Sequence, residues 1–475
     1  VTMKQINIPP IRIPEFRMPS LGLSAIGLPA DRSGNRLAWP SGLKDSIVCW
    51  YSPRKQGLTE YDVIESYAED FTSSKFDVKD ANATVTNKVL TYSRDAVEPT
   101  TSRILTTKEE LDEMVVKVTL DVSAFSYRYL DKNLNLIDIK LKNGINVLPK
   151  SYSNNFYIVG FIYTGNKYAA NITIEQLPTS KAKDFSANGH DLFLYKFKGK
   201  LDSGIGLYLY DFTSDLRINS AHLPYTDIQA NSICSLSGHV AGWLFQFKDP
   251  NINIAPLKIK VKGIVNNIFE YWGYDENGIR FYFKINKDGV YELPASYVVE
   301  TNNGVGIICL TDCVDNVCFT QIPDYPNQLC YNGSSYGVAY GLPILNDYTI
   351  IADRVPFDYD GAFCSKRTKE DKGAFFLEKR AADKVEYAFS FGSTTKINFV
   401  QPGITWQTAN SYNGQTITKG TLKDTDFFLI GGGLYKTDSD LYTELWKGCH
   451  GDILLFNRTL TDDEITWLKE NWEKL

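Results

Sequence analysis

Three carboxylates in the stretch TEYDVIES, Glu60, Asp62 and Glu65, are the sharpest candidates for chemistry in this 475-residue sequence. Cleavage of a glycosidic bond uses two carboxyl groups, one as general acid and one as nucleophile, and a neighbouring acid can tune their pKa values. The surrounding stretch, GLTEYDVIESYAEDF, is also typical of a solvated loop or short helix with its acids outward.

The order Glu-x-Asp-x-x-Glu resembles the catalytic strand of jelly-roll glycoside hydrolases of family 16. The resemblance implies that one of Glu60 and Glu65 is the nucleophile and the other the acid/base. Two departures count against it. Tyr61 stands where that family has a small aliphatic residue, and the motif follows the first expected strand instead of lying mid-chain. We therefore favour a solvated acidic segment and no enzyme activity, with a hydrolase as the alternative.

A cysteine cluster in CLTDCVDNVC raises the question of a metal site. Its three thiols belong to Cys309, Cys313 and Cys318. No CxxC pair or fourth ligand accompanies them, as a zinc site would require. In an internal repeat 145 residues earlier, these positions are Thr164, Tyr168 and Thr173. Free thiols are therefore favoured over a local disulfide or zinc, and most of the eight cysteines are expected to be free and buried.

Other residue types give no site. The four histidines, His190, His222, His239 and His450, lie in unrelated segments. No serine or cysteine has a nucleophile-elbow context, so a hydrolytic triad has no support. The run Gly431–Gly433 follows an expected strand but lacks a downstream Lys-Ser/Thr or helix, and so predicts a turn instead of a phosphate-binding loop.

Loop acids and aromatic residues are weak candidates for Ca²⁺ or sugar binding. They are Asp347, Asp424, Asp426, Asp438 and Asp440, with Trp406, Tyr412 and Trp446 as stacking residues. None forms a recognisable ligand string, so ordinary loop solvation is favoured and no catalytic, cofactor or metal residue is assigned. The sequons at Asn82, Asn171, Asn332 and Asn457 would matter only in a eukaryotic secretory setting.

Composition narrows the class of partner. The formal net charge is −6 with acids and bases dispersed, which argues against nucleic acid or an anionic membrane as the main partner. No apolar run approaches the roughly 20 residues that span a bilayer. The start lacks the order of a secretion signal, but it begins at Val1, so export stays open.

Residues 1–40 form a proline-rich, apolar segment, INIPPIRIPEFRMPSLGLSAIGLP at its centre. Proline at this density fixes φ and removes backbone donors, so the segment should be extended and cannot occupy the middle of a sheet. It is too apolar for a solvated linker. It either packs over its own domain or, as we favour, docks as an arm onto another subunit.

An internal repeat divides the chain. KNGINVLPKSY (142–152) matches KDGVYELPASY (287–297), and NITIEQLP (171–178) matches NVCFTQIP (316–323), both at a spacing of 145 residues. Short alternating strands lie upstream of the first matched segment within each copy, so we infer two small β-sandwiches inserted into a larger domain. The remaining pieces read as many short strands bounded by turns, which indicates a two-sheet jelly roll.

The expected organisation therefore has six segments. They are an anchoring arm (1–40), jelly roll (41–79), sandwich copy 1 (80–178), jelly roll (179–218), sandwich copy 2 (219–323) and jelly roll (324–475).

The closing stretch GDILLFNRTLTDDEITWLKENW (451–472) predicts a strand, a corner and one short helix. The apolar run Ile453–Phe456 is typical of a strand buried on both faces. Thr461 and Glu464 fit a capping box, and an apolar face follows. This order resembles the end of laminin-G-like, concanavalin A-like jelly rolls, as do DFSANGHDL (184–192), FFLIGGG (427–433) and NDYTIIADRV (346–355). The expected fold is all-β: such a jelly roll interrupted by two homologous sandwiches, with the arm and a C-terminal helix.

The whole arrangement is similar to virion-associated proteins of crAss-like tailed phages that infect gut Bacteroidetes. That resemblance implies a fibre, appendage or decoration protein that is assembled in the bacterial cytoplasm and located in the virion. From the proline-rich apolar arm we expect other virion subunits as partners through residues 1–40. From the rigid, aromatic β surfaces we expect a homo-oligomer, with a host-surface glycan as a further candidate partner.

Overall fold

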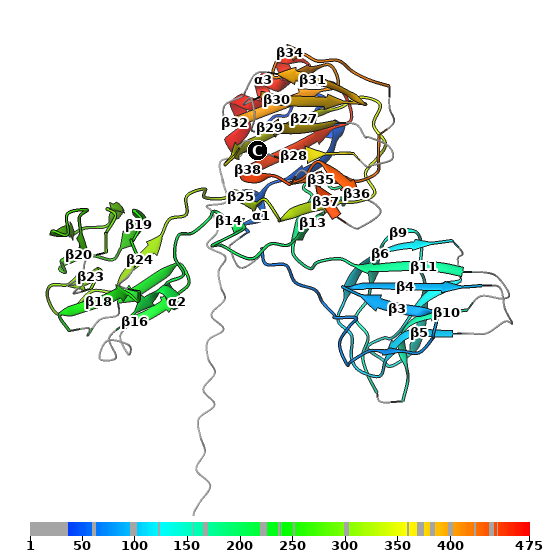
Figure 1. Cartoon of the computed structure of the whole chain (residues 1–475), viewed down its shortest axis with the longest axis horizontal. Coiled ribbons are helices and arrows are strands. Elements are labelled where there is room, and N and C mark those ends of the chain that lie inside the picture. The colour runs from blue at the N-terminus through cyan, green and yellow to red at the C-terminus, as the bar shows by residue number, and fades with distance from the viewer. Residues whose placement is uncertain are drawn as a thin grey trace, which may run out of the picture.

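The computed structural model describes residues 37–475 apart from 59–62, 96–101, 122–123, 155, 165–169, 219–225, 236–237, 239, 250–251, 299–303, 359–360, 368–374, 381–384, 398–401, 422–423, 437–440 and 444, and describes only the backbone of 375–380, 385–386, 434–436 and 441–443. The expected arm therefore lies outside the described residues except for its last four. The fold is all-β, and three β-sandwiches with one C-terminal helix confirm the expected fold class (Figure 1).

The largest sandwich, the jelly roll, collects strands from three separated parts of the chain. One sheet runs β14-β25-β38-β27-β32-β33-β34, and β1 pairs with β38. The other sheet runs β12-β13-β26-β35-β28-β29-β30-β31. One core cluster contains Val48, Leu192, Ile350, Phe428 and Ile453, which come from both sheets, so the two sheets pack face to face.

The strands of the first sheet are β1 (Ile47–Tyr51), β14 (Gly204–Ile205), β25 (Leu329–Asn332), β27 (Thr349–Pro356), β32 (Gly403–Thr408), β33 (Ser411–Tyr412), β34 (Gln415–Thr416) and β38 (Lys447–Phe456). Those of the second are β12 (Lys181–Ala182), β13 (Leu192–Tyr195), β26 (Tyr336–Ala339), β28 (Ala362–Ser365), β29 (Phe375–Arg380), β30 (Val385–Ser390), β31 (Ser393–Ile397) and β35 (Phe428–Ile430). A separate two-stranded ribbon joins β36 (Leu434–Lys436) to β37 (Leu441–Thr443).

Two smaller sandwiches, copy 1 and copy 2, interrupt the jelly roll and have the same topology. Copy 1 has sheets β2-β5-β10-β7-β8 and β3-β4-β11-β6-β9. Copy 2 has sheets β15-β18-β23-β20-β21 and β16-β17-β24-β19-β22. Taken in chain order, every strand of copy 1 has its counterpart at the same place in copy 2. Each copy also has its own hydrophobic core.

The strands of copy 1 are β2 (Asp77–Val78), β3 (Ala83–Thr86), β4 (Val89–Arg94), β5 (Ser102–Thr107), β6 (Met114–Leu120), β7 (Phe125–Leu130), β8 (Leu136–Lys140), β9 (Gly144–Leu148), β10 (Val159–Tyr163) and β11 (Ala170–Gln176). Those of copy 2 are β15 (Leu216–Arg217), β16 (Thr226–Gln229), β17 (Ser232–Ser235), β18 (Gly242–Phe247), β19 (Leu257–Lys262), β20 (Phe269–Tyr274), β21 (Arg280–Ile285), β22 (Gly289–Leu293), β23 (Gly306–Cys309) and β24 (Val317–Gln321).

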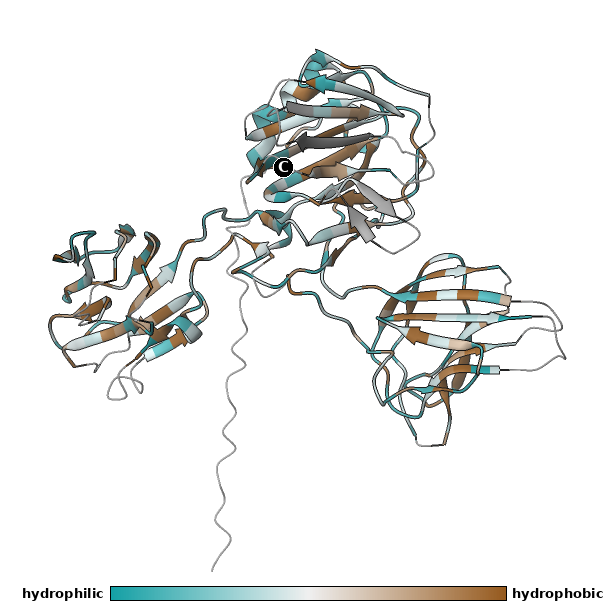
Figure 2. Ribbon diagram, viewed as in Figure 1, coloured by the Kyte–Doolittle hydropathy of each residue, from teal (hydrophilic) through white to brown (hydrophobic). Residues whose placement is uncertain are grey.

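Alternation along the strands explains why these segments form sandwiches. In β6 and β19, buried residues alternate with more exposed ones, which is the period of a strand with one face in a core. Figure 2 shows the same alternation as bands along the strands of copy 1. Phe71 and Phe76 pack in the core of copy 1, and Phe212 and Leu216 in that of copy 2. Both cores therefore begin earlier in the chain than residues 80 and 219.

The closing stretch has the predicted structure. Ile453–Phe456 are fully buried in β38, which lies inside its sheet between β27 on one side and β1 with β25 on the other. The helix α3 (Asp462–Asn471) begins with the predicted capping box of Thr461 and Glu464 and continues into a short 3-10 turn, η3 (Trp472–Lys474). The other short helices in the described part of the chain are η1 (Lys44–Ser46), α1 (Pro53–Gln56) and α2 (Phe212–Asp215).

Candidate ligand groove between copy 1 and the jelly roll

The turn Asp184–Asp191 forms one rim of a groove, and a buried carboxylate holds it in place. Asp184 is 4% exposed, and its Oδ1 accepts hydrogen bonds from the backbone N–H of Trp50 (3.0 Å) and Ser186 (2.8 Å). Its Oδ2 accepts from the N–H of His190 (3.0 Å). The turn that the sequence pattern singled out is therefore fixed to β1 by a side chain that is satisfied inside the fold.

Further hydrogen bonds order the rest of this rim. The Asn188 side-chain amide donates to the carbonyl oxygens of Ile47 (3.0 Å) and Val48 (2.9 Å). The Tyr51 hydroxyl donates to the carbonyl oxygen of His190 at 2.6 Å. Because the rim is held by β1, a ligand would meet a surface that is already ordered.

The opposite wall belongs to copy 1. Val115 on β6 packs against a jelly-roll cluster that includes Phe193 and Phe427. The Lys117 ammonium lies 4.7 Å from the ring centroid of Tyr340, a cation–π contact between the two sandwiches. Copy 1 thus contacts the jelly roll through the outer face of β6, and the neighbouring strand β9 lines the cavity beside this contact.

The cavity between these walls has a volume of about 670 Å³, within the range of small-molecule sites. Its lining residues are Val115, Lys117, Asn143, Gly144, Ile145, Val147, Lys181, Asn188, Gly189, His190, Asp191, Phe193, Tyr340, Gly341, Asp426 and Phe427. Aromatic rings, aliphatic side chains, amides and charges of both signs meet here. This mixture suits a ligand with apolar faces and many hydroxyl groups, such as a sugar.

Glu65, the one residue of the acidic motif that the structure describes, does not line this cavity. Both Glu65 oxygens are engaged near the entry to copy 1: Oε1 accepts from the Tyr67 hydroxyl (2.6 Å) and Oε2 from the backbone N–H of Lys196 (2.6 Å). Glu65 therefore ties the connection into copy 1 to the jelly roll. Glu60 and Asp62 lie outside the described residues.

The cysteine prediction is confirmed in part and wrong at one residue. Cys309 and Cys313 are free and buried, and burial raises the pKa of Cys309 to about 12, so its thiol stays protonated. Cys318 forms a disulfide with Cys234 on the neighbouring strand β17. The prediction of a free thiol was wrong here because the partner comes from a strand 84 residues earlier, which spacing around Cys318 alone could not reveal.

Six of the eight cysteines are free and buried, as expected. They are Cys49, Cys309, Cys313, Cys330, Cys364 and Cys449.

Two proposed stacking residues belong to the core. Tyr412 and Trp446 are each 1% exposed, so neither can meet a sugar at the surface, whereas Trp406 is half-buried. Tyr412 accepts a hydrogen bond from the Arg354 guanidinium at 2.9 Å. The aromatic residues that line the groove are Phe193, Tyr340 and Phe427, and none of them was proposed as a stacking residue from the sequence.

The loop acids have separate structural positions. Asp424 is buried and pairs with Lys366 at 3.0 Å, and Asp347 accepts from the Thr459 N–H at 2.9 Å. Asp426 is exposed and lines the groove. Asp438 and Asp440 lie outside the described residues.

The histidines are dispersed, as the sequence indicated. His190 is at the groove rim, and His450 is fully buried against Tyr331, whose hydroxyl lies 3.1 Å from its Nε2. Burial lowers the pKa of His450 to about 4, so it is neutral at pH 7. His222 and His239 lie outside the described residues.

Among the described residues, no group of three or more His, Cys, Asp or Glu side chains is placed to hold a metal ion. None of the helices that the structure describes is long and apolar enough to span a membrane.

Comparisons with known proteins identify no family. No family model matches the chain, and no curated protein matches it. Among solved structures, Trypanosoma rangeli sialidase in complex with sialic acid matches over 82% of this chain and 83% of its own, at 9% identity and a TM-score of 0.22. The same sialidase with the inhibitor DANA matches over 86% and 85%, at 10% identity and a TM-score of 0.16. Similarity this low supports no conclusion about fold or function.

Proposed function

We propose that this chain is a non-enzymatic structural protein of a virion and that its groove contacts a host-surface glycan. The observation that carries the glycan part is the groove itself. An ordered jelly-roll rim and the outer face of copy 1 enclose a cavity lined by Tyr340, Phe193 and several polar side chains. Aromatic rings can stack on the apolar face of a sugar, while amides and charges bind its hydroxyl groups.

The state of the carboxylates supports binding over hydrolysis. Glycoside hydrolysis uses a pair of carboxyl groups on either side of the scissile bond. In the groove, Asp191 accepts from the Asp184 N–H (3.0 Å) and pairs with Lys181 (2.7 Å), so both its oxygens serve the rim. Among the described lining residues, that leaves Asp426 as the carboxylate available to a ligand. Both Glu65 oxygens are also engaged in hydrogen bonds, which likewise favours binding over hydrolysis.

The virion part rests on the resemblance of the arm and the closing motif to virion-associated proteins of tailed phages. The end of the arm is seen against the body. Leu37 and Trp39 pack on the cluster around α3, and the Trp39 ring lies 5.2 Å from that of Trp467 and 6.0 Å from that of Trp50. We infer that residues 1–36 bind other virion subunits and that Leu37–Pro40 belong to the body.

Truncation at this boundary tests the proposal. Residues 37–475 should fold, since Trp39 and its contacts are retained, but should fail to enter particles when they replace the full chain during infection. Purified particles would be probed by mass spectrometry and by antibody labelling. Full-length chain must label the particles. Absence of the full chain from particles would overturn the virion role. Full incorporation of the truncated chain would overturn the anchoring role.

A further inference from the structure

The outer face of one sheet in copy 2 carries aromatic residues where the equivalent face of copy 1 carries charged ones. Strand pairing aligns the two copies residue by residue, because Gly160 and Gly306 occupy the same place on β10 and β23. Gly160 faces Arg128 in copy 1, and Gly306 faces Trp272 in copy 2. Arg128 in turn faces Asp138, whereas Trp272 faces Tyr282.

The neighbouring row shows the same change. Arg103 faces Ile162 in copy 1, and Trp243 faces Ile308 in copy 2. Three charged residues on the outer face of copy 1 are thus aromatic in copy 2. Copy 1 demonstrates that the sandwich folds without aromatic residues here, so core packing does not require them.

These three aromatic residues of copy 2, Trp243, Trp272 and Tyr282, form a continuous surface that we name the aromatic platform. The Trp272 ring lies 5.2 Å from that of Trp243 and 5.1 Å from that of Tyr282. Tyr282 is 57% exposed, and both tryptophans are half-buried. The Trp272 indole N–H donates to the Glu270 carboxylate at 2.9 Å, which fixes the ring.

A cation lies on the platform. The Arg280 guanidinium is 4.3 Å from the ring centroid of Trp272 and 5.7 Å from that of Tyr274. Among the described residues, no carboxylate pairs with Arg280, in contrast to Arg128 of copy 1, which Asp138 neutralises through two hydrogen bonds of 2.7 and 2.8 Å. Copy 1 has Leu136 at the place of Arg280. The Arg280 charge therefore lies beside an aromatic face without a paired carboxylate among the described residues, and the Glu270 carboxylate on the Trp272 indole is the acidic group of the platform.

A cavity of about 360 Å³ lies beside β15 and β18 of the same sheet. It is lined by Arg217, Gln246, Lys248, Asp249 and Tyr297, among others. Gln246 of the cavity pairs with Gly306, and Gly306 pairs with Trp272 of the platform, so the three residues form one row across the sheet. Cavity and platform are therefore two strand spacings apart, or roughly 10 Å. The Arg217 guanidinium donates to the Gln246 side chain at 2.8 Å.

We propose that this face of copy 2 binds an acidic glycan, whose sugar rings stack on Trp272 and Tyr282 and whose carboxylates pair with Arg280 and Arg217. Aromatic faces recognise sugar rings, and guanidinium groups recognise carboxylates. Arg280 and Arg217 place positive charge on this face although the chain as a whole has a net charge of −6. This site is separate from the groove and goes beyond the function proposed above.

The test titrates the full chain with oligogalacturonate, an acidic probe, and with dextran, a neutral one, by calorimetry. The key variant carries Trp243→Arg, Trp272→Arg and Tyr282→Asp, the residues of copy 1 at these positions, so the sheet should still form. Its fold is checked by circular dichroism and by the Cys234–Cys318 disulfide. The exposed variant Val265→Ala is the matched control.

We expect the wild type to bind oligogalacturonate in preference to dextran. The triple variant should weaken this binding at least about tenfold, Arg280→Leu should weaken it as well, and Val265→Ala should leave it unchanged. Unchanged binding by a folded triple variant, equal binding of dextran, or no binding by the wild type would overturn the proposal. Self-association of the wild type that the triple variant abolishes would instead make this face a protein interface and would also overturn it.

Discussion

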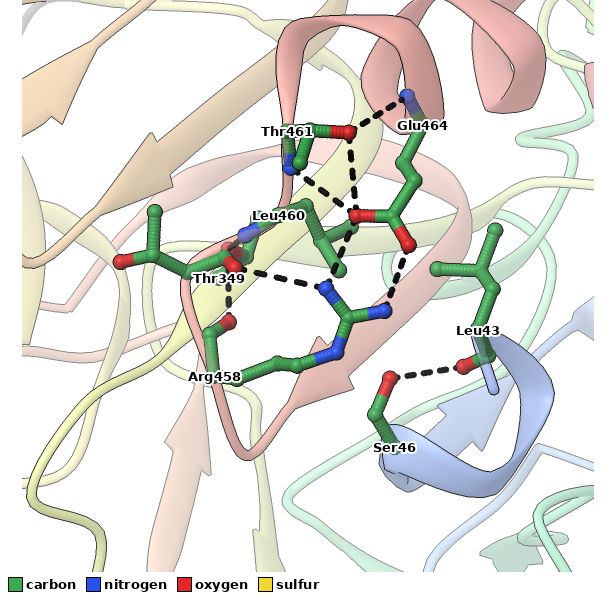
Figure 3. A network of polar contacts seen from close by, with 8 residues as sticks. Leu43, Ser46, Thr349, Arg458, Leu460, Thr461 and Glu464 are labelled. Carbon is green, nitrogen blue, oxygen red and sulfur yellow. Dashed lines mark hydrogen bonds and ion pairs between the residues drawn. The ribbon is translucent and has the colours of Figure 1, made fainter. Parts of the chain in front are cut away.

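At the scale of single residues, one network around Glu464 joins the last strand to the last helix (Figure 3). Both Glu464 oxygens accept from the Arg458 guanidinium, at 2.6 and 2.8 Å, and one also accepts from the Thr461 N–H at 2.9 Å. The Thr349 hydroxyl of β27 donates to the Arg458 carbonyl oxygen at 2.9 Å and accepts from the Leu460 N–H at 2.9 Å. The capping box was readable from sequence, but the role of Arg458 depends on the geometry of the corner.

This network predicts a pH-dependent stability. Hydrogen bonds from Arg458 lower the pKa of Glu464 to about 2, from an ordinary value of 4.5. A carboxylate whose pKa is lowered by folding stabilises the fold fully above its unfolded pKa, and the contribution is lost as the pH falls to the folded pKa. Glu464→Gln should therefore cost about 2 kcal/mol at pH 7, and the difference from wild type should shrink between about pH 4.5 and 2.

Urea unfolding at several pH values measures this difference. Arg458→Gln removes the main cause of the lowered pKa and should flatten the pH dependence in the same way. A difference between wild type and Glu464→Gln that stays constant down to pH 2.5 would contradict the assignment.

The second prediction at this scale concerns Asp184, which holds the groove rim. Asp184→Ala leaves the backbone N–H groups of Trp50, Ser186 and His190 without their acceptor, two of them in or beside a buried strand. The free energy of unfolding of the jelly roll should fall by about 2–4 kcal/mol. Denaturant titration of wild type, Asp184→Ala and the exposed control Asp45→Ala measures it. A loss below about 0.5 kcal/mol would show that water replaces the carboxylate.

At the scale of elements, the two copies of one sandwich explain which features the fold requires. The disulfide Cys234–Cys318 joins β17 to β24 at the place where Thr91 faces Thr173 on β4 and β11. Because copy 1 folds with threonines at this position, the disulfide adds stability to a topology that does not depend on it.

Replacing Cys234 and Cys318 by the threonines of copy 1 should leave copy 2 folded but less stable. The disulfide closes a long loop, with a sequence separation of 84 residues, so its loss should cost about 2–4 kcal/mol. Denaturant unfolding under oxidising and reducing conditions compares the variant with wild type. The two proteins should differ only under oxidising conditions, and a difference that persists after reduction would point to altered packing instead.

Docking of copy 1 on the jelly roll has a similar internal control. Val115 faces Val147 on the docking face, whereas the equivalent pair in copy 2 is Lys258 and Glu292. Val115→Lys with Val147→Glu should keep copy 1 folded, as copy 2 demonstrates, but should weaken its contact with Tyr340. Hydrogen exchange should rise in residues 184–191 and around Tyr340, while the core strand β10 stays protected. Unchanged exchange at the rim would mean that this face does not hold copy 1.

At the scale of the whole molecule, sequence reasoning reached the fold better than the site. The 145-residue repeat and the closing motif predicted a jelly roll interrupted twice, because both can be recognised from short stretches of sequence. The groove was not predictable, since Lys117 and Tyr340 are distant in sequence and meet only when copy 1 docks. The aromatic platform was missed for another reason. Trp272 corresponds to Arg128, and Trp243 to Arg103, so the spacing there is below 145 and only strand pairing aligns these residues.

The central claim, glycan contact without hydrolysis, is tested most directly by one paired measurement on capsular polysaccharides of gut Bacteroidetes. The protein used is the full chain with the three platform substitutions, so that binding at the groove is measured without the platform. Polysaccharide binding and the release of reducing ends are followed in the same samples. We predict saturable binding that Tyr340→Ala weakens about tenfold or more and that the exposed control Val265→Ala retains, with no release of reducing ends. Release of reducing ends that Glu65→Gln abolishes, or no binding to any polysaccharide of the panel, would contradict the account.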